Sequence, residues 1–257
     1  MKCLAGRKGV YALSKALGLP SASTIRASKP LRLLPSVAAP KPAEFGTNIR
    51  TFFGPDSTNV TFRKAGHALM VDGLHLSQRA CWHRPSNQII GFCREHSEPL
   101  DLAMNDMTSV LEVVEAVHGE NPTCHYGREA TVFAIGAFRD DNYHAVPVAQ
   151  TQTCEAEKGP AFAALLQTAI EQWDIHGAPH NGPLFLASMD GDSVFREGTF
   201  QVLMCRTVNT SSPLYLKLSG CAGLNLQCGK NDVVAGPDPL HVTKRQLVHF
   251  LSSWFEY

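Results

Sequence analysis

The sequence predicts an α/β fold in which helices cover a mixed sheet. Short apolar runs with strand character alternate with segments whose apolar residues recur at helical spacing. With 257 residues, 44% of them apolar and 18% charged, the chain is long enough for one sizeable core and is not disordered overall. Strands followed by alternating helices and strands favour a layered architecture.

The chain begins with a basic arm over residues 1–27. Val10, Leu13 and Leu17 have helical spacing, and the turn Gly18-Leu19-Pro20 separates this helix from a second short one. The arm is therefore predicted to be partly helical and to resemble a helix-turn-helix. Prolines recur from Pro30 to Pro42, so residues 28–60 are predicted to form an extended linker before the folded domain, residues 61–257.

The folded domain is expected to contain five strands and three long helices. The apolar runs predict strands at His67–Gly73, Asn87–Cys93, Ala130–Phe138, His144–Gln150 and Pro183–Ala187. Helical periodicity predicts helices at Met107–Val117, from Gly159-Pro160 to Trp173, and at Val194–Met204. In the first helix, Val110, Val113, Val114 and Val117 are expected to form the apolar face.

Composition narrows the possible partners and compartments. Lys and Arg number 23, as do Asp and Glu, so no net charge draws the chain to nucleic acid or an acidic membrane. Any DNA contact is expected through the basic arm. Because no apolar run approaches the ~20 residues of a membrane helix and no secretory signal is visible, we expect no membrane partner and an intracellular, non-secreted protein.

The eight cysteines have irregular spacing, which favours reduced thiols over a disulfide framework. Three groups combine Cys with His: Cys81-Trp82-His83, Cys93-Arg94-Glu95-His96 and Cys124-His125. None has the paired spacing typical of zinc ligands, so the sequence alone predicts no zinc site.

Acidic residues follow two of the predicted strands. Asp72 ends the first strand, Asp190 and Asp192 follow a later one, and Asp238 lies further along the chain. Two-metal phosphoryl-transfer sites need several carboxylates around ions ~4 Å apart. The alternative is that each Asp is a turn residue or helix cap, and Asp192 before Ser193-Val194 fits that role closely.

Three short motifs occur in a familiar order: Leu69-Met70-Val71-Asp72, then Ser188-Met189-Asp190-Gly191-Asp192-Ser193, then Asp238-Pro239-Leu240-His241-Val242-Thr243-Lys244-Arg245. Together with the helical segment from Gly9 to Arg26, they resemble the RNase H-like core of P-element/THAP-type transposases. Such cores also occur in transposon-derived fungal proteins. The resemblance spans most of the chain from Gly9 to Arg245.

The resemblance implies a DDE/D transposase that uses Mg²⁺ to cleave and join DNA in the nucleus. By motif position, Asp72 matches the first catalytic aspartate and Asp190 the second, with Asp192 as a rival. Asp238 is a further candidate metal ligand. His241 and Lys244 match the family's Asp-Pro-x-His-x-x-Lys segment, whose role is structural or supportive of the site.

Two departures from the family lower the expected activity. The family has Asp-Glu at the first site, where this chain has Asp72-Gly73, and its final catalytic acid lies beyond the segment that this chain, ending at Tyr257, contains. We therefore expect a truncated, degenerate RNase H-like protein without full strand-transfer activity. The alternatives are a domesticated non-catalytic module that contacts protein or nucleic acid, and a small metal-dependent enzyme with an unrelated substrate. The sequence does not predict an oligomeric state.

Overall fold

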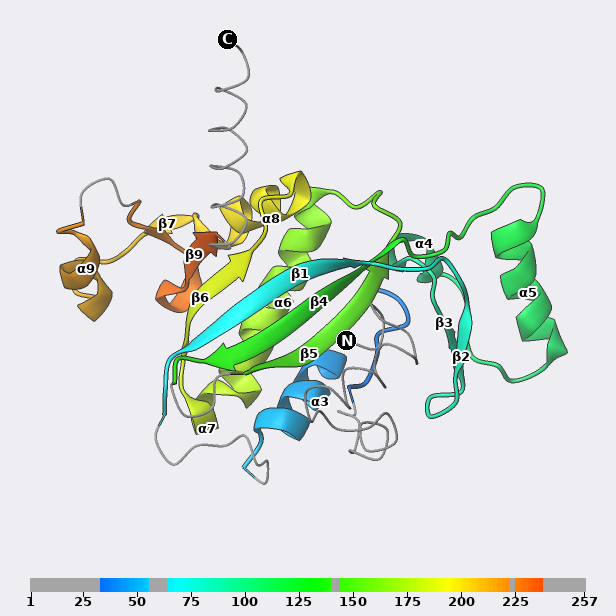
Figure 1. Cartoon of the computed structure of the whole chain (residues 1–257), viewed down its shortest axis with the longest axis horizontal. Helices are drawn as coiled ribbons and strands as arrows, with labels where there is room; N and C mark the ends of the chain where they lie inside the picture. Colours follow the sequence, from blue (N-terminus) through cyan, green and yellow to red (C-terminus); the bar gives the residue numbers. More distant parts are fainter. Residues whose placement is uncertain (1–32, 56–63, 140–143, 222–224, 238–257) are drawn as a thin grey trace, which may run out of the picture. The chain divides into compact units, whose positions relative to one another are not determined.

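The computed structural model describes residues 33–55, 64–139, 144–221 and 225–237 (Figure 1). The chain divides into two units, Met1–Leu33 and Leu34–Tyr257, and every element below belongs to the second. The predicted basic arm lies outside the described residues. Among the described helices, none is long and apolar enough to span a membrane.

A five-stranded mixed sheet forms the centre of the second unit. Its strands are β1 (His67–His75), β4 (Glu129–Ala137), β5 (Ala145–Thr153), β6 (Leu184–Met189) and β9 (Val234–Pro237), in the spatial order β5-β4-β1-β6-β9. Strand β4 is antiparallel to both β1 and β5, whereas β1, β6 and β9 run parallel. The predicted α/β fold with a mixed sheet is confirmed.

Three helices cover one face of this sheet (Figure 1): α3 (Pro42–Phe53), α6 (Gly159–His176) and α8 (Ser193–Leu203), with the short α7 (Ala178–Asn181) after α6. Phe133 of β4 packs edge-on against Phe45 of α3, with ring centroids 5.4 Å apart, and stacks on Phe162 of α6 at 6.2 Å. Burying rings of this size contributes about 1.5–3 kcal/mol each. The helices predicted after Gly159 and at residues 194–204 are therefore confirmed.

Helix α3 corrects the predicted linker. Phe45 and Ile49 lie one turn apart and both have 0% exposure, so this helix belongs to the folded domain. Pro42 does not prevent the helix, because a proline at the first helical position loses no intrahelical hydrogen bond. The second unit begins at Leu34, well before residue 61.

A smaller satellite lies between β1 and β4 in the sequence. It contains the hairpin of β2 (Cys81–His83) and β3 (Gln88–Ile90), the short α4 (Arg94–Ser97) and α5 (Met107–His118). Its own core consists of Phe92, Leu102, Val113 and Cys124. The strand predicted at 87–93 thus joins a separate two-stranded sheet, and the expected helix at 107–117 is confirmed.

The α5 face differs from the predicted one. Val113 is buried, but Val114 is 47% exposed, together with Met107 and Leu111. The satellite core is too small to cover two sides of this helix.

After α8 the chain forms small elements that lead to the sheet edge. They are β7 (Arg206–Thr207), α9 (Pro213–Leu218), β8 (Gln227–Cys228) and a 3₁₀ helix (Lys230–Asp232), followed by β9. Among its described residues, this region holds no long helix.

Candidate metal-binding pocket

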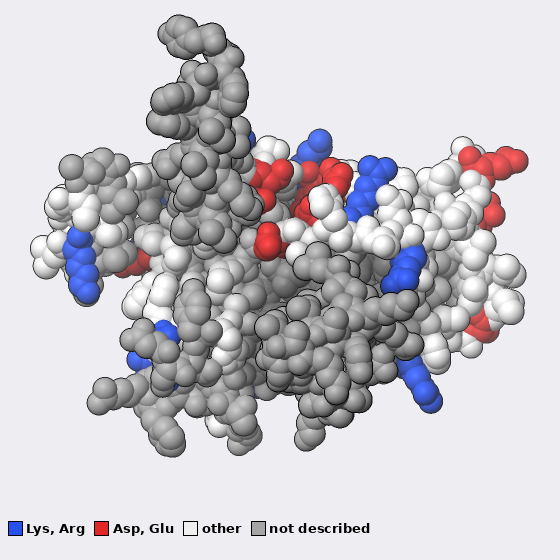
Figure 2. All heavy atoms as spheres, in the orientation of Figure 1, with Lys and Arg blue, Asp and Glu red and all other residues white. Residues whose placement is uncertain are grey.

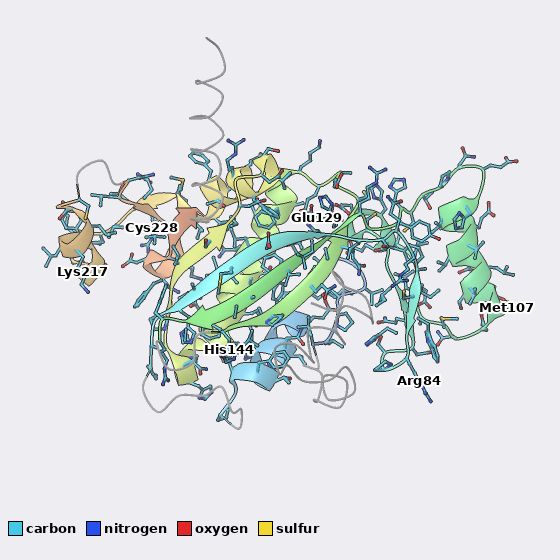
Figure 3. All side chains as sticks on the ribbon, in the orientation of Figure 1. Arg84, Met107, Glu129, His144, Lys217 and Cys228 are labelled. Atoms are coloured by element: carbon cyan, nitrogen blue, oxygen red, sulfur yellow. The ribbon has the colours of Figure 1, made fainter. Side chains whose placement is uncertain are left out.

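A pocket of about 390 Å³ lies where four strands reach the same edge of the sheet. The register pairs His75 at the end of β1 with Glu129 at the start of β4, and Glu129 with Thr153 at the end of β5. Asp190 and Asp192 follow β6 and line the same pocket. Figure 2 shows acidic side chains gathered near the top of the view, in the region where Figure 3 labels Glu129.

Three side chains in this pocket are close enough to hold one metal ion. His75, Glu129 and Glu155 each offer a ligand atom, and these atoms lie within 4.8 Å of one another. They come from β1, from β4 and from the residues that follow β5. The two carboxylates suit Mg²⁺ or Mn²⁺, and the imidazole favours Mn²⁺ over Mg²⁺.

The electrostatics of Glu129 also favour a cation. Burial raises the pKa of its carboxyl, and the neighbouring carboxylates of Glu155, Asp190 and Asp192 raise it further, while His75 acts in the opposite direction. Several carboxylates that repel one another in a partly desolvated pocket are stabilised when a divalent cation enters.

Glu155 adopts an unusual backbone conformation. Its φ of 69° lies in the left-handed region, which a residue with a side chain rarely occupies. The backbone N–H of Glu155 donates to the Thr153 hydroxyl at 2.9 Å, which holds this turn. The turn places the Glu155 carboxylate beside Glu129 and His75.

A buried ion pair forms one wall of the pocket. Arg94 of α4 donates from Nε to Glu157 Oε1 at 2.8 Å and from Nη2 to Glu157 Oε2. Its Nη1 donates to the Thr131 hydroxyl of β4 at 3.1 Å. Because Arg94 neutralises Glu157, the negative charge that remains in the pocket comes from Glu129, Glu155, Asp190 and Asp192.

The structure brings Asp190 and Asp192 together. The Asp192 backbone N–H donates to Asp190 Oδ1 at 3.0 Å. Asp192 is also the N-cap of α8, since its Oδ1 accepts from the Val194 N–H at 2.8 Å. The helix-cap interpretation of Asp192 is therefore confirmed, and the residue also lines the pocket.

Asp72 occupies the position after Val71, which the parallel register pairs with Met189 of β6. Asp72 and Asp190 are thus the next residues along two adjacent parallel strands. Asp72 is exposed, and its Oδ1 accepts from the Gly73 N–H at 3.0 Å. It does not line the pocket, whereas Gly73 does, because neighbouring side chains of a strand alternate between faces.

The remaining predicted site residues, Asp238, His241 and Lys244, lie outside the described residues. Conversely, sequence reasoning missed His75, Glu129 and Glu155. Each is a single polar residue at a strand end, and no spacing rule connects three segments that meet only in the folded sheet.

The Glu129 carboxylate fills the space beside Gly73 in the pocket. A Cβ placed on Gly73 would meet the Glu129 carboxylate. In this chain the carboxylate of Glu129 therefore lies where a side chain at position 73 would begin.

No family model matches the sequence, and no curated protein matches it. Among solved structures, the chain is similar to one in the Drosophila P element transposase strand transfer complex, with a TM-score of 0.37 and 9% sequence identity. The alignment covers 94% of this chain and 50% of that one. The chain thus spans about half the length of the transposase chain that it matches.

Proposed function

We propose that this chain is a transposase-derived RNase H-like protein that binds a divalent cation in the acidic pocket and lacks full DDE/D strand-transfer activity. One observation carries the proposal. The adjacent parallel strands β1 and β6 end beside a pocket in which His75, Glu129 and Glu155 converge with Asp190 and Asp192. DNA is the proposed partner, on the basis of the basic arm in the sequence.

The residues have distinct parts in this proposal. His75, Glu129 and Glu155 hold the cation, and Asp190 supplies a further carboxylate at the same pocket. When bound, Mg²⁺ would supply Lewis-acid polarisation of a phosphoryl oxygen. Arg94 keeps Glu157 neutralised, so that Glu157 does not add to the repulsion among the other carboxylates.

Two features support reduced activity. One carboxylate oxygen of Asp192 caps α8 by accepting from the Val194 N–H, and Asp72 does not line the pocket. The Glu129 carboxylate lies next to Gly73, where the resembled family carries Glu, but it is held by β4 and not by β1. A two-metal site is sensitive to the position of each carboxylate, so binding of one cation is retained more easily than strand transfer.

The test is calorimetric titration of Mg²⁺ and Mn²⁺ into the full chain. We expect one ion per chain, and we expect Glu129→Gln to weaken binding about tenfold or more, which corresponds to ~1.4 kcal/mol. Asp72→Asn is the matched control on the neighbouring strand, and its affinity should equal that of the wild type. A labelled DNA duplex incubated with Mn²⁺ should show no strand joining.

The opposite pattern would contradict the proposal. If Asp72→Asn abolishes binding while Glu129→Gln leaves it intact, the cation follows the ancestral arrangement and not the pocket. Efficient strand joining would restore the active-transposase interpretation.

A double variant tests whether the acid can come from the neighbouring strand. Glu129→Ala with Gly73→Glu should recover part of the cation affinity that Glu129→Ala alone loses, because the new carboxylate enters the space of Glu129 from β1.

A second candidate, the non-catalytic interaction module, is favoured by the surface of α5. Met107, Leu111 and Val114 are 71%, 59% and 47% exposed and lie at i, i+4 and i+7 of this helix. An exposed apolar stripe of this spacing is typical of a helix that contacts another protein. Absence of Mg²⁺ and Mn²⁺ binding at the acidic pocket, with retained folding, would favour this candidate.

A further inference from the structure

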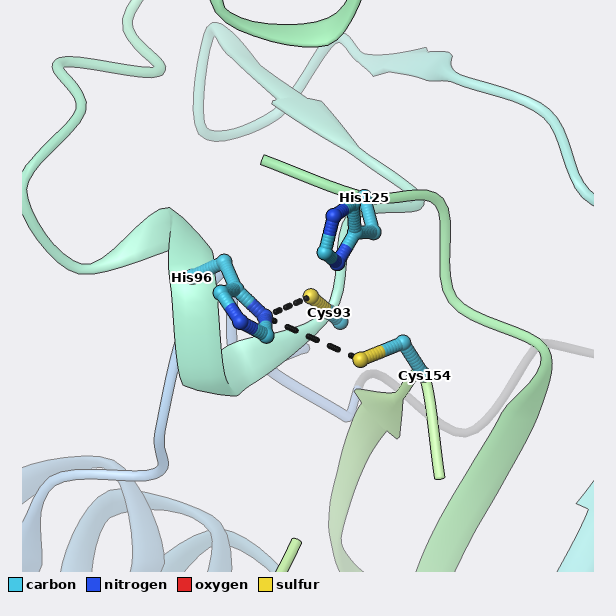
Figure 4. Close-up of side chains that lie close together, drawn as sticks. All are labelled: Cys93, His96, His125 and Cys154. Carbon is cyan, nitrogen blue, oxygen red and sulfur yellow. Dashed lines mark hydrogen bonds between the residues drawn. The ribbon is translucent and has the colours of Figure 1, made fainter. Parts of the chain in front are cut away.

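We propose that Cys93, His96, His125 and Cys154 form a structural zinc site at the junction of the satellite and the main sheet. Figure 4 shows the four side chains pointing toward a common centre. Each offers one ligand atom, and the four atoms lie within 4.8 Å of one another. This site is separate from the acidic pocket and does not depend on the function proposed above.

The distances between the ligand atoms suit a tetrahedral ion. His96 Nδ1 lies 3.1 Å from Cys93 Sγ and 3.7 Å from Cys154 Sγ. With Zn–S bonds of ~2.3 Å and Zn–N bonds of ~2.0 Å, a tetrahedron places sulfur and nitrogen about 3.5 Å apart. The His96 and His125 rings, whose centroids are 4.4 Å apart, complete the group.

The backbone fixes these positions without the ion. Cys93 is the N-cap of α4, and His96 follows one turn later. The Cys93 N–H donates to the His125 carbonyl at 2.9 Å, and the neighbouring residues Phe92 and Tyr126 form a β-bridge. Cys154 comes directly after β5. Three segments far apart in sequence thus converge on one point.

The donor set selects zinc over the hard cations. Two sulfurs and two imidazoles are ligands for Zn²⁺, whereas Mg²⁺ and Ca²⁺ prefer oxygen. Because four protein ligands fill a tetrahedron and leave no position for substrate, the site is structural. All seven cysteines of the described segments are free of disulfides, so these sulfurs are available to a metal.

The position of the site explains why the fold would use an ion there. Among the described residues, the satellite core has four buried members and six partly buried hydrophobic residues packed against them, and a core of that size contributes little stability by itself. Cys93, His96 and His125 belong to the satellite side, and Cys154 follows a strand of the main sheet. A zinc ion would therefore fasten the satellite to the edge of the sheet.

The first experiment measures metal in the full chain purified without chelators. We expect one zinc per chain by elemental analysis. After replacement by Co²⁺, we expect the absorption of a tetrahedral cobalt ion with a thiolate-to-metal charge-transfer band. Cys154→Ser should weaken Co²⁺ binding by roughly 100-fold or more. Cys81→Ser, which removes an exposed satellite thiol, should leave both the stoichiometry and the spectrum unchanged.

Two further variants keep the test decisive if Cys154→Ser folds poorly. Cys154→His should still bind cobalt, with about half the charge-transfer intensity, because one of two thiolates is gone. Glu129→Gln should keep the complete cobalt spectrum, which separates this site from the acidic pocket. Zinc far below one per chain, a Cys93–Cys154 disulfide in the purified protein, or an unchanged spectrum in Cys154→His would overturn the proposal.

Discussion

The two clusters of candidate ligands differ in chemistry although they share neighbouring residues. Cys154 belongs to the sulfur and nitrogen cluster, and the next residue, Glu155, belongs to the oxygen-rich pocket. In the first cluster Cys93 is buried, His96 and Cys154 are half-buried and His125 is exposed, and the acidic pocket is lined by residues of α4 and α8 at the sheet edge. One turn of chain after β5 thus serves both a site of sulfur and nitrogen donors and a site of mainly oxygen donors. Donor chemistry, and not position in the sequence, separates the proposed structural zinc site from the proposed Mg²⁺ or Mn²⁺ site.

The largest effect is expected from breaking the ion pair that lies beside both clusters. Arg94→Leu leaves Glu157 buried without its partner, and the two side chains are only 2% and 6% exposed. Loss of one partner of such a pair costs about 3–5 kcal/mol. Denaturant unfolding of the full chain should show this loss.

The double variant Arg94→Met with Glu157→Leu is the control for that effect. It removes both charges together, so most of the stability should return. If Arg94→Leu alone is as stable as the wild type, the ion pair does not hold α4 against the sheet.

The next effect comes from removing the proposed zinc. At free zinc one hundred times the dissociation constant, the ion stabilises the folded junction by about 2.7 kcal/mol. Chelation should therefore increase amide hydrogen exchange in residues 81–126 and much less in the main sheet. Omitting Mg²⁺ should leave exchange in the satellite unchanged, because the proposed ligands His75, Glu129 and Glu155 all lie outside residues 81–126. If chelation increases hydrogen exchange equally in the satellite and in the main sheet, the proposed zinc does not stabilise the satellite specifically.

A smaller effect tests whether Asp192 acts mainly as a helix cap. Asp192→Ala removes the acceptor for the Val194 N–H and should lower stability by about 1 kcal/mol. Asp192→Ser keeps a capping oxygen but removes the charge, so it should restore stability. Mn²⁺ titration of the serine variant then measures how much the charge of Asp192 contributes to Mn²⁺ affinity. A large loss of Mn²⁺ affinity in Asp192→Ser would make Asp192 a ligand of the pocket.

The main sheet was predictable because its signals are local. Each long strand and the helices after Gly159 and Ser193 carry their own periodicity, and these elements formed where the pattern placed them. Helix α3 was missed because Pro42 was interpreted as a breaker, although proline is well tolerated at a helix start. The signal that could have found it is the spacing of Phe45, Ile49 and Phe52.

The two clusters were less predictable because their members meet only after folding. Cys93 and His96 form a single pair in the sequence, whereas His125 lies just before β4 and Cys154 directly follows β5. A rule based on paired spacing therefore rejected the zinc ligands. Glu129 was likewise inconspicuous, since only the register of β1 and β4 places it beside His75 and Gly73.

The smallest expected effect belongs to His67, which contributes a pH dependence unrelated to either cluster. Burial lowers the pKa of this histidine, whose ring packs against Trp173 with centroids 4.8 Å apart. The unfolded chain therefore takes up a proton before the folded one does. Stability should be complete above the unfolded pKa of ~6.5 and should fall as the pH drops from there toward the lower folded value. His67→Phe keeps an aromatic ring against Trp173 and should flatten the stability profile in this window. If the slope persists in His67→Phe, other groups cause it, and the acid sensitivity of the clusters must be measured before metal titrations at different pH are compared.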